Sequence, residues 1–282
     1  MTTSSYADSL GISGTGLVLL RDLIHERTGI FYENGRSYLL VDKVSPLIVS
    51  RGLTSLLDYY YVLKYDAQAD AEWQRLMDAL SVPETFFWRS VDQIDALTDI
   101  LVPRHFAQPG AKPLTIWSAA CSTGEEPLTI AMSLNEKGWF NRAPIEIIGS
   151  DASPAAITTA RQGEYRERSF RNLPPVLRAK YFSEGANNRW RASPAIHSRI
   201  RWANANLTSE SEIKSFATAD VIFCRNVFIY FSETAIMNTL KSFYKLMPSP
   251  AYLFVAAAEL SIKLARDFEL AEVGGALAYV KR

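Results

Sequence analysis

The sequence predicts an α/β fold with a mostly parallel sheet, preceded by a small all-helical domain. From Leu114 onward, apolar strand-like runs alternate with helical patterns, which is typical of a parallel sheet covered by helices. Before residue 81, apolar residues recur at helical spacing only. The 282 residues are 48% hydrophobic and 21% charged, with a formal net charge of +0, which is ordinary for a globular chain.

The all-helical domain is expected to span residues 1–81 and to contain four amphipathic helices. Their apolar stripes are Leu19, Leu20, Leu23 and Ile24; Tyr38, Leu39, Leu40, Val44, Leu47 and Ile48; Leu56, Leu57, Tyr60 and Tyr61; and Trp73, Leu76, Met77 and Leu80. Pro46 lies inside the second stripe and is expected to kink or shorten that helix. Residues 1–15 are polar and rich in glycine and serine, so we expect poor order there.

The second domain is expected to span residues 82–282, with residues 82–85 as the link. A helix is expected around residues 94–101, and further helices begin at Pro127, Pro154 and Thr234. Strands are expected near residues 116–119, 145–149, 221–223, 252–255 and 278–280. Residues 182–205 interrupt this alternation, and we interpret them as a short antiparallel β insertion.

The most informative stretch is LTIWSAACSTGEEPLTIAM, residues 114–132. It predicts a strand, a tight turn ending at Gly124, and a helix with Pro127 in its first turn. Glu125 and Glu126 stand where a phosphate-binding turn would present bare N–H groups. They would repel a pyrophosphate and favour a cationic cofactor with hydroxyls, which indicates S-adenosylmethionine and disfavours a nicotinamide dehydrogenase. The alternative is a turn that binds nothing.

Two further strand ends carry polar residues. Asp151 ends a buried strand, where it would either accept hydrogen bonds from ribose hydroxyls or cap the next helix; we favour the ribose role. Asn204–Leu207 is a polar hinge of the kind that often reads adenine. Arg225 and Asn226 interrupt the apolar run DVIFCRNVFIYF, where packing gives no reason for them. The sequence therefore predicts a ligand site at these strand ends.

Composition limits the other functions. No apolar run is long enough to span a membrane and the N-terminus lacks an export signal, so we expect a cytoplasmic protein. Cys121 and Cys224 are interpreted as small buried residues, and the three scattered histidines predict no metal site. Residues 161–201 carry ten basic residues against three glutamates. This stretch is either a surface for an acidic partner or a solvated face, and no nucleic-acid motif accompanies it.

Five segments together resemble the CheR family of chemotaxis-receptor methyltransferases. They are VPETFFWRS (82–90), IWSAACSTGEEPLTIAM (116–132), GSDAS (149–153), NANL (204–207) and VIFCRNVFIYF (221–231). The resemblance covers nearly the whole chain. It implies a Rossmann-like class I methyltransferase domain that moves a methyl group from S-adenosylmethionine to receptor glutamates and leaves S-adenosylhomocysteine.

The resemblance also implies particular site residues. The cofactor-binding residues, with the turn glycine included, are Thr85, Arg89, Gly124, Glu126, Asp151, Asn206, Leu207, Arg225 and Asn226. Arg89 and Tyr230 match the pair nearest the transferred methyl group. The alternatives are that Arg89 only pairs with Glu125 or Glu126 and that Tyr230 belongs to the core. The implied partner is the cytoplasmic helical region of methyl-accepting receptors, bound by a monomer without nucleic acid or membrane insertion.

Some positions depart from the family pattern. Pro83 stands where relatives usually have asparagine, and residues 256–258 are all alanine before Glu259. The second helix, usually strongly basic, offers only Lys43 and Arg51. The β insertion is short, so we expect an enzyme that is independent of a receptor C-terminal pentapeptide. The alternatives are a non-catalytic adaptor of the same fold that binds cofactor and receptors, or a class I methyltransferase acting on a small molecule or nucleic acid.

Overall fold

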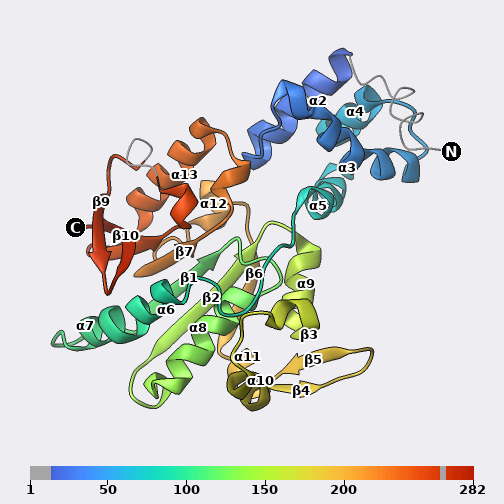
Figure 1. Ribbon diagram of the computed structural model, residues 1–282. Helices are drawn as coiled ribbons and strands as arrows, with labels where there is room; N and C mark the ends of the chain where they lie inside the picture. Colours follow the sequence, from blue (N-terminus) through green and yellow to red (C-terminus); the bar gives the residue numbers. More distant parts are fainter. Residues whose placement is uncertain (1–13, 261–264) are drawn as a thin grey trace. The chain divides into compact units, whose positions relative to one another are not determined.

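A computed structural model describes residues 14–260 and 265–282 (Figure 1). The chain divides into two compact units. One unit contains the residues up to Val82 together with Tyr230–Ile236, and the other contains Pro83–Ile229 and Met237–Arg282. Most of the N-terminal segment that was expected to be poorly ordered lies outside the described residues, and the first helix begins at Thr15.

The first unit is helical, as the apolar stripes predict. It contains α2 (Thr15–Thr28), the short 3₁₀ helix η1 (Asn34–Arg36), α3 (Ser37–Ser50), α4 (Leu56–Tyr65) and α5 (Ala69–Leu80). Its core brings together one apolar face from each long helix, with Leu20, Val44, Tyr59 and Trp73 all buried. Of the four aromatic residues in the stripes, Tyr60 and Trp73 lie in the core, whereas Tyr38 and Tyr61 are exposed.

Pro46 does not shorten α3, so that part of the expectation is wrong. The helix continues from Ser37 to Ser50 with Pro46 inside it. Ile48, just after the proline, is fully buried in the helical core. Burial of this apolar face favours the helix beyond the residue where local propensity alone would end it.

The segment Tyr230–Ile236 belongs to the helical unit through main-chain contacts. Ile30 forms an antiparallel bridge with Phe231, and the Phe31 N–H donates to the Tyr230 carbonyl at 2.8 Å. The Ser232 N–H donates to the Gly29 carbonyl at 3.3 Å. The residues after α2 therefore hold the backbone that carries Tyr230.

The second unit is built on a seven-stranded sheet of order β6-β2-β1-β7-β8-β10-β9. Its strands are β1 (Leu114–Ala119), β2 (Ile145–Asp151), β6 (Ile200–Asn204), β7 (Val221–Cys224), β8 (Ala251–Phe254), β9 (Glu269–Val273) and β10 (Ala276–Lys281). The first five run parallel to one another, whereas β10 is antiparallel to β8 and β9. The predicted, mostly parallel sheet is confirmed.

Helices cover both faces of this sheet. The long ones are α8 (Glu125–Glu136), α9 (Pro154–Gln162) and α13 (Glu233–Leu246), and a continuous helical segment runs through α6 (Val91–Asp95), the π-helix η2 (Ala96–Leu101) and α7 (Val102–Phe106). The shorter ones are η3 (Trp139–Asn141), η4 (Glu167–Phe170), α10 (Pro175–Tyr181), α11 (Pro194–His197), α12 (Glu210–Ile213), η5 (Phe228–Tyr230) and η6 (Ala257–Glu259). Ile116 of β1 packs in the core cluster with α8, whereas the next residue, Trp117, stacks edge-on with Phe243 of α13. This alternation places α8 and α13 on opposite faces.

The antiparallel insertion is present but differs from the predicted range. It is a three-stranded sheet of order β3-β5-β4, formed by β3 (Glu164–Arg166), β4 (Phe182–Glu184) and β5 (Arg189–Ala192). It therefore begins before residue 182, and Ile200–Asn204 is instead the parallel edge strand β6 beside β2. The short sequence IRWAN mixes apolar and polar residues as an edge strand does, so it gave no sign of parallel pairing. Strand β9, also at an edge and rich in glutamate, was missed.

Candidate functional site

The site lies where the strand order reverses. The chain builds the sheet outward from β1 to β2 and β6, then returns to place β7 and β8 on the other side of β1. Ala119 and Cys224 pair in the last register position of β1 and β7. In open α/β sheets, ligands bind outside the carboxyl ends of the strands at this reversal. The turn Ala120–Gly124 and the pair Arg225–Asn226 leave the sheet at this point.

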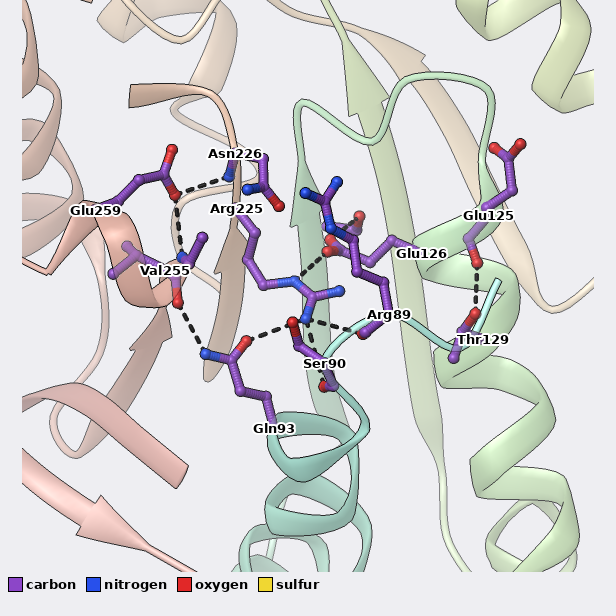
Figure 2. Close-up of polar contacts among 12 residues, drawn as sticks. Arg89, Ser90, Gln93, Glu125, Glu126, Thr129, Arg225, Asn226, Val255 and Glu259 are labelled. Atoms are coloured by element: carbon purple, nitrogen blue, oxygen red, sulfur yellow. Dashed lines mark hydrogen bonds and ion pairs between the residues drawn. The ribbon is translucent and has the colours of Figure 1, made fainter. Parts of the chain in front are cut away.

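Arg225 lies at the centre of a buried polar network (Figure 2). Its Nε donates to Glu126 Oε2 at 2.6 Å, and its side chain is only 4% exposed. One terminal nitrogen donates to Gln93 Oε1 and to the Arg89 carbonyl, both at 3.1 Å. Gln93 in turn donates to the Val255 carbonyl at 2.8 Å. Each of these buried polar groups needs the others as hydrogen-bond partners, so the network fixes Arg225 between α6, α8 and the end of β8.

The two neighbouring carboxylates of α8 have different surroundings. Glu126 accepts a hydrogen bond from Ser118 at 2.6 Å in addition to its ion pair with Arg225, and its side chain remains 13% exposed. Glu125 is buried, and its oxygens accept hydrogen bonds from Thr123 at 2.7 Å and Ser169 at 2.9 Å. Figure 2 shows the Glu125 carboxylate pointing away from Arg225.

The picture of two free acids at the mouth of the site is therefore wrong. Burial raises the pKa of Glu125. Its carboxylate links the turn, through Thr123, to η4, through Ser169. Glu126 alone remains partly accessible, and its ion-pair partner is Arg225. Sequence could not distinguish the two glutamates, because adjacent helical residues point about 100° apart and the direction depends on the packing.

Strained backbone gathers at this site. Trp88, Ser90, Ala120, Ser122 and Asn226 all have positive φ, between 51° and 66°, which non-glycine residues rarely adopt. All five lie in the segments that leave the strand ends or contact Arg225. Such strain persists only where the surroundings impose it, and it is common at functional sites.

Asp151 ends β2 beside the turn. One carboxylate oxygen accepts from the Ser122 N–H at 2.8 Å, and the other accepts from the Ser153 N–H at 2.9 Å. The N-cap of α9 is Ser153, whose hydroxyl accepts from the Ala156 N–H, so the capping alternative for Asp151 is wrong. Asp151 thus braces the turn at Ser122, and carboxylate oxygens can accept further hydrogen bonds.

The remaining predicted cofactor residues lie around this centre. Gly124 has φ 96°, and a Cβ there would lie 2.8 Å from the Trp202 ring. The turn therefore needs glycine both for its backbone and for the close approach of Trp202. Asn206 accepts from the Thr208 N–H at 3.1 Å, and Leu207 is buried. Thr85 is half-buried before the Trp88 turn.

Arg89 contributes its main-chain carbonyl to the network, whereas its side chain forms its hydrogen bond outside the network. A terminal nitrogen donates to the Glu84 carbonyl at 3.4 Å, and the guanidinium lies 5.2 Å from the Phe86 ring centroid. Burial, assisted by the nearby Arg225 charge, lowers the pKa of Arg89. The alternative that Arg89 only pairs with Glu125 or Glu126 is wrong, because the ion-pair partner of Glu126 is Arg225. Tyr230 is 37% exposed, so the alternative that it is a core residue is wrong.

Two residues of the network were absent from the sequence-based site: Gln93 and Glu259. The Glu259 carboxylate accepts hydrogen bonds from the main-chain N–H groups of Asn226 at 2.7 Å and Phe228 at 2.8 Å. Gln93 bridges Arg225 and Val255. An isolated glutamine on an amphipathic helix carries no signal in sequence, whereas Glu259 was marked only by the unusual alanines before it.

Half of the basic residues in the stretch 161–201 form ion pairs within their own unit. Five of its residues pair with glutamates: Arg171 with Glu84, Arg178 with Glu167, Lys180 with Glu136, Arg191 with Glu164, and Arg201 with Glu146. The register places Glu164, Arg166, Arg189 and Arg191 on one side of the small sheet. Because three arginines face one glutamate there, this side is a basic face. With Arg161 and His197, most of this face borders an open hollow.

Residues 14–260 and 265–282 contain neither a membrane-spanning helix nor a metal-binding cluster. No helix there combines the length and apolar character needed to cross a membrane. In the same residues, no group of three or more histidine, cysteine, aspartate or glutamate side chains is arranged to hold a metal ion. Cys121 and Cys224 are buried as free thiols, as expected.

Both parts of the chain match known protein families. Residues 83–274 match the family described as CheR methyltransferase, SAM binding domain, so the second unit is an S-adenosylmethionine-binding methyltransferase domain. Residues 16–81 match the description CheR methyltransferase, all-alpha domain. The chain belongs to the CheR methyltransferase family.

Curated relatives are similar along nearly their whole length. Chemotaxis protein methyltransferase 2 of Vibrio cholerae is 32% identical over 275 residues, covering 96% of this chain and 94% of the relative. Chemotaxis protein methyltransferase 1 of Pseudomonas aeruginosa is 29% identical, covering 93% and 96%. The chemotaxis protein methyltransferase of Escherichia coli is also 29% identical, covering 93% and 90%. The cofactor expected from the sequence, S-adenosylmethionine, agrees with this family.

Proposed function

We propose that this protein is a protein-glutamate O-methyltransferase that acts in the cytoplasm on the helical region of chemotaxis-type receptors. The observation that carries the proposal is the family match over residues 83–274, which includes the buried Arg225–Glu126 pair at the strand-order reversal. The similar chemotaxis methyltransferases of other bacteria support the receptor as substrate. We propose a monomer that binds no nucleic acid, with residues 1–81 and 82–282 as its two domains.

The site has the chemistry that S-adenosylmethionine requires. Asp151 and Glu126 would present carboxylate oxygens to ribose hydroxyls and to a positive charge. Two N–H groups of the turn are already donated within the chain, Ser122 to Asp151 and Gly124 to the Cys121 carbonyl. The other proposed cofactor-binding residues are Thr85, Arg89, Gly124, Asn206, Leu207, Arg225 and Asn226. When bound, this cofactor supplies a methyl group attached to a cationic sulfur, and S-adenosylhomocysteine is its product.

The reaction does not require a general base from the protein. A substrate glutamate with an ordinary pKa of about 4.3 is already ionised at neutral pH, so no side chain has to remove a proton. The tasks left to the chain are positioning and exclusion of water. In this proposal Arg89 and the Tyr230 hydroxyl orient the incoming carboxylate. Arg89 orients without a tight ion pair, because a strong ion pair would lower the nucleophilicity of the carboxylate.

The experiment compares Arg89→Ala and Tyr230→Phe with the unaltered protein. Each variant is expected to lose most of its turnover on receptor-containing membranes. Affinity for S-adenosylhomocysteine, measured by calorimetry, is expected to fall much less, because both side chains act on the substrate carboxylate. Normal methylation by both variants would contradict these roles.

We propose that this chain does not recognise its receptor through a strongly basic second helix, as the family resemblance would imply. The two basic residues in and just after α3 already have partners. Lys43 donates to the Ala79 carbonyl at 3.0 Å, and Arg51 pairs with the buried Glu72 at 2.8 Å. The basic face of the small sheet is the alternative surface for an acidic receptor segment. We also propose that methylation does not require a receptor C-terminal pentapeptide.

A further inference from the structure

The loop after β7 is held by a single carboxylate from the loop after β8. Strands β7 and β8 are parallel neighbours, with Phe223 opposite Phe254, so their following loops leave the same edge of the sheet. Glu259, in the loop after β8, accepts hydrogen bonds from the N–H groups of Asn226, Phe228 and, more weakly at 3.4 Å, Ile229. Its second oxygen also accepts from the Ala256 N–H at 3.0 Å.

This contact has the form of an anion in a backbone nest. Asn226 has φ 60°, a left-handed conformation, and the N–H groups around it converge on one point. Such an arrangement forms a concavity that binds anions. Here the chain supplies the anion itself, and the charge-assisted hydrogen bonds offset the conformational cost of the left-handed residue.

The anchored residue adjoins the buried network. The Arg225 side chain is fixed by Glu126 and Gln93, whereas the main chain of the next residue is fixed by Glu259 (Figure 2). Gln93 also donates to Val255, which lies at the start of the loop that carries Glu259. The two anchors therefore determine the direction in which the Asn226 side chain leaves the strand.

We infer that Glu259 is a positioning residue of the cofactor site, which acts by holding Asn226 in its left-handed conformation. The inference rests on the proposed function, in which Asn226 contacts S-adenosylmethionine. Glu259 itself needs no contact with the cofactor. A carboxylate is required because both of its oxygens accept hydrogen bonds, whereas an amide at this position could accept with only one.

The test measures S-adenosylhomocysteine binding by calorimetry. Glu259→Gln is expected to weaken binding about tenfold, the equilibrium equivalent of one or two lost hydrogen bonds. Glu272→Gln, which removes the same charge from an exposed position on β9, is the matched control and is expected to bind as the unaltered protein does. A Glu259→Gln variant that folds and binds within twofold of the unaltered protein overturns the inference.

A double-mutant cycle distinguishes positioning from a general loss of structure. If Glu259 acts through Asn226, Glu259→Gln combined with Asn226→Ala is expected to bind about as weakly as Asn226→Ala alone. Combined with Thr85→Ala, its effect is expected to multiply. Multiplicative effects in both pairs overturn the inference.

A third measurement does not depend on whether the variant folds. In the unaltered protein, the amide hydrogens of Asn226 and Phe228 are expected to exchange slowly with solvent, because both are donated to Glu259. Exchange at the rate of a free loop contradicts the anchor. If the unaltered protein binds no S-adenosylhomocysteine but these amides are protected, the proposed function fails and the anchor stands as structure only.

Discussion

Arg225 and Arg191 both pair with a glutamate, but in different surroundings. The Arg225 and Glu126 side chains are 4% and 13% exposed. The Arg225 guanidinium donates hydrogen bonds to Glu126, to Gln93 and to the Arg89 carbonyl. The Arg191 and Glu164 side chains are 64% and 28% exposed on the small sheet. Buried pairs are costly to break because the remaining charge is left without compensation, whereas exposed pairs contribute little. The buried pair fixes the position of Arg225, whereas the exposed pair constrains only side chains on a surface.

The largest expected effect comes from breaking the buried pair. Arg225→Met leaves the Glu126 charge and the Gln93 acceptor without a partner, so the free energy of unfolding is expected to fall by about 3–5 kcal/mol. The matched change on the surface, Arg191→Met, is expected to cost no more than about 1 kcal/mol. Urea unfolding of the two variants measures both. Equal losses would contradict the distinction between the two regions.

A smaller effect is expected from Glu125, the buried acid beside the pair. Burial raises its pKa above the ordinary value for glutamate, so the folded chain holds the proton more tightly than the unfolded chain. Ionisation therefore destabilises the fold as pH rises above that value. The free energy of unfolding of Glu125→Gln, relative to the unaltered protein, is expected to be lowest at pH 4 and to increase toward pH 7.

The pH series needs a control for general charge effects. Glu272→Gln, on the exposed side of β9, is expected to show no such increase between pH 4 and pH 7. Urea midpoints of the three proteins at each pH give the comparison. A flat difference for Glu125→Gln would show that its burial does not affect its protonation.

The smallest effect on stability is expected on the basic face. Arg189→Glu and Arg191→Glu lie on an exposed sheet surface, so each is expected to change the free energy of unfolding by no more than about 1 kcal/mol. Their effect is expected in recognition: methylation of receptor membranes falls severalfold, while affinity for S-adenosylhomocysteine is unchanged.

Receptors with and without their C-terminal tails should give the same rates with the unaltered protein. Dependence on the tail would contradict pentapeptide independence.

The same contrast explains what the sequence could and could not predict. The βα turn at residues 119–124 and the polar interruption at Arg225 were visible because each breaks a local apolar pattern. The partners of Arg225 were not, since Gln93 lies 132 residues away and carries no local signal. Edge strands such as β6 and β9 were misassigned or missed, because half-exposed residues blur the strand pattern. The distinct roles of Glu125 and Glu126 depend on packing that no local rule contains.

Methyl transfer itself tests the central claim most directly. The protein is incubated with methyl-labelled S-adenosylmethionine and membranes that contain chemotaxis receptors, and the label on the receptor is then treated with base. The proposed reaction predicts receptor label that base releases as methanol, because carboxylate methyl esters are base-labile, and S-adenosylhomocysteine should suppress it. Label that resists base would contradict ester formation. Binding of S-adenosylhomocysteine without any transfer would instead identify a non-catalytic adaptor.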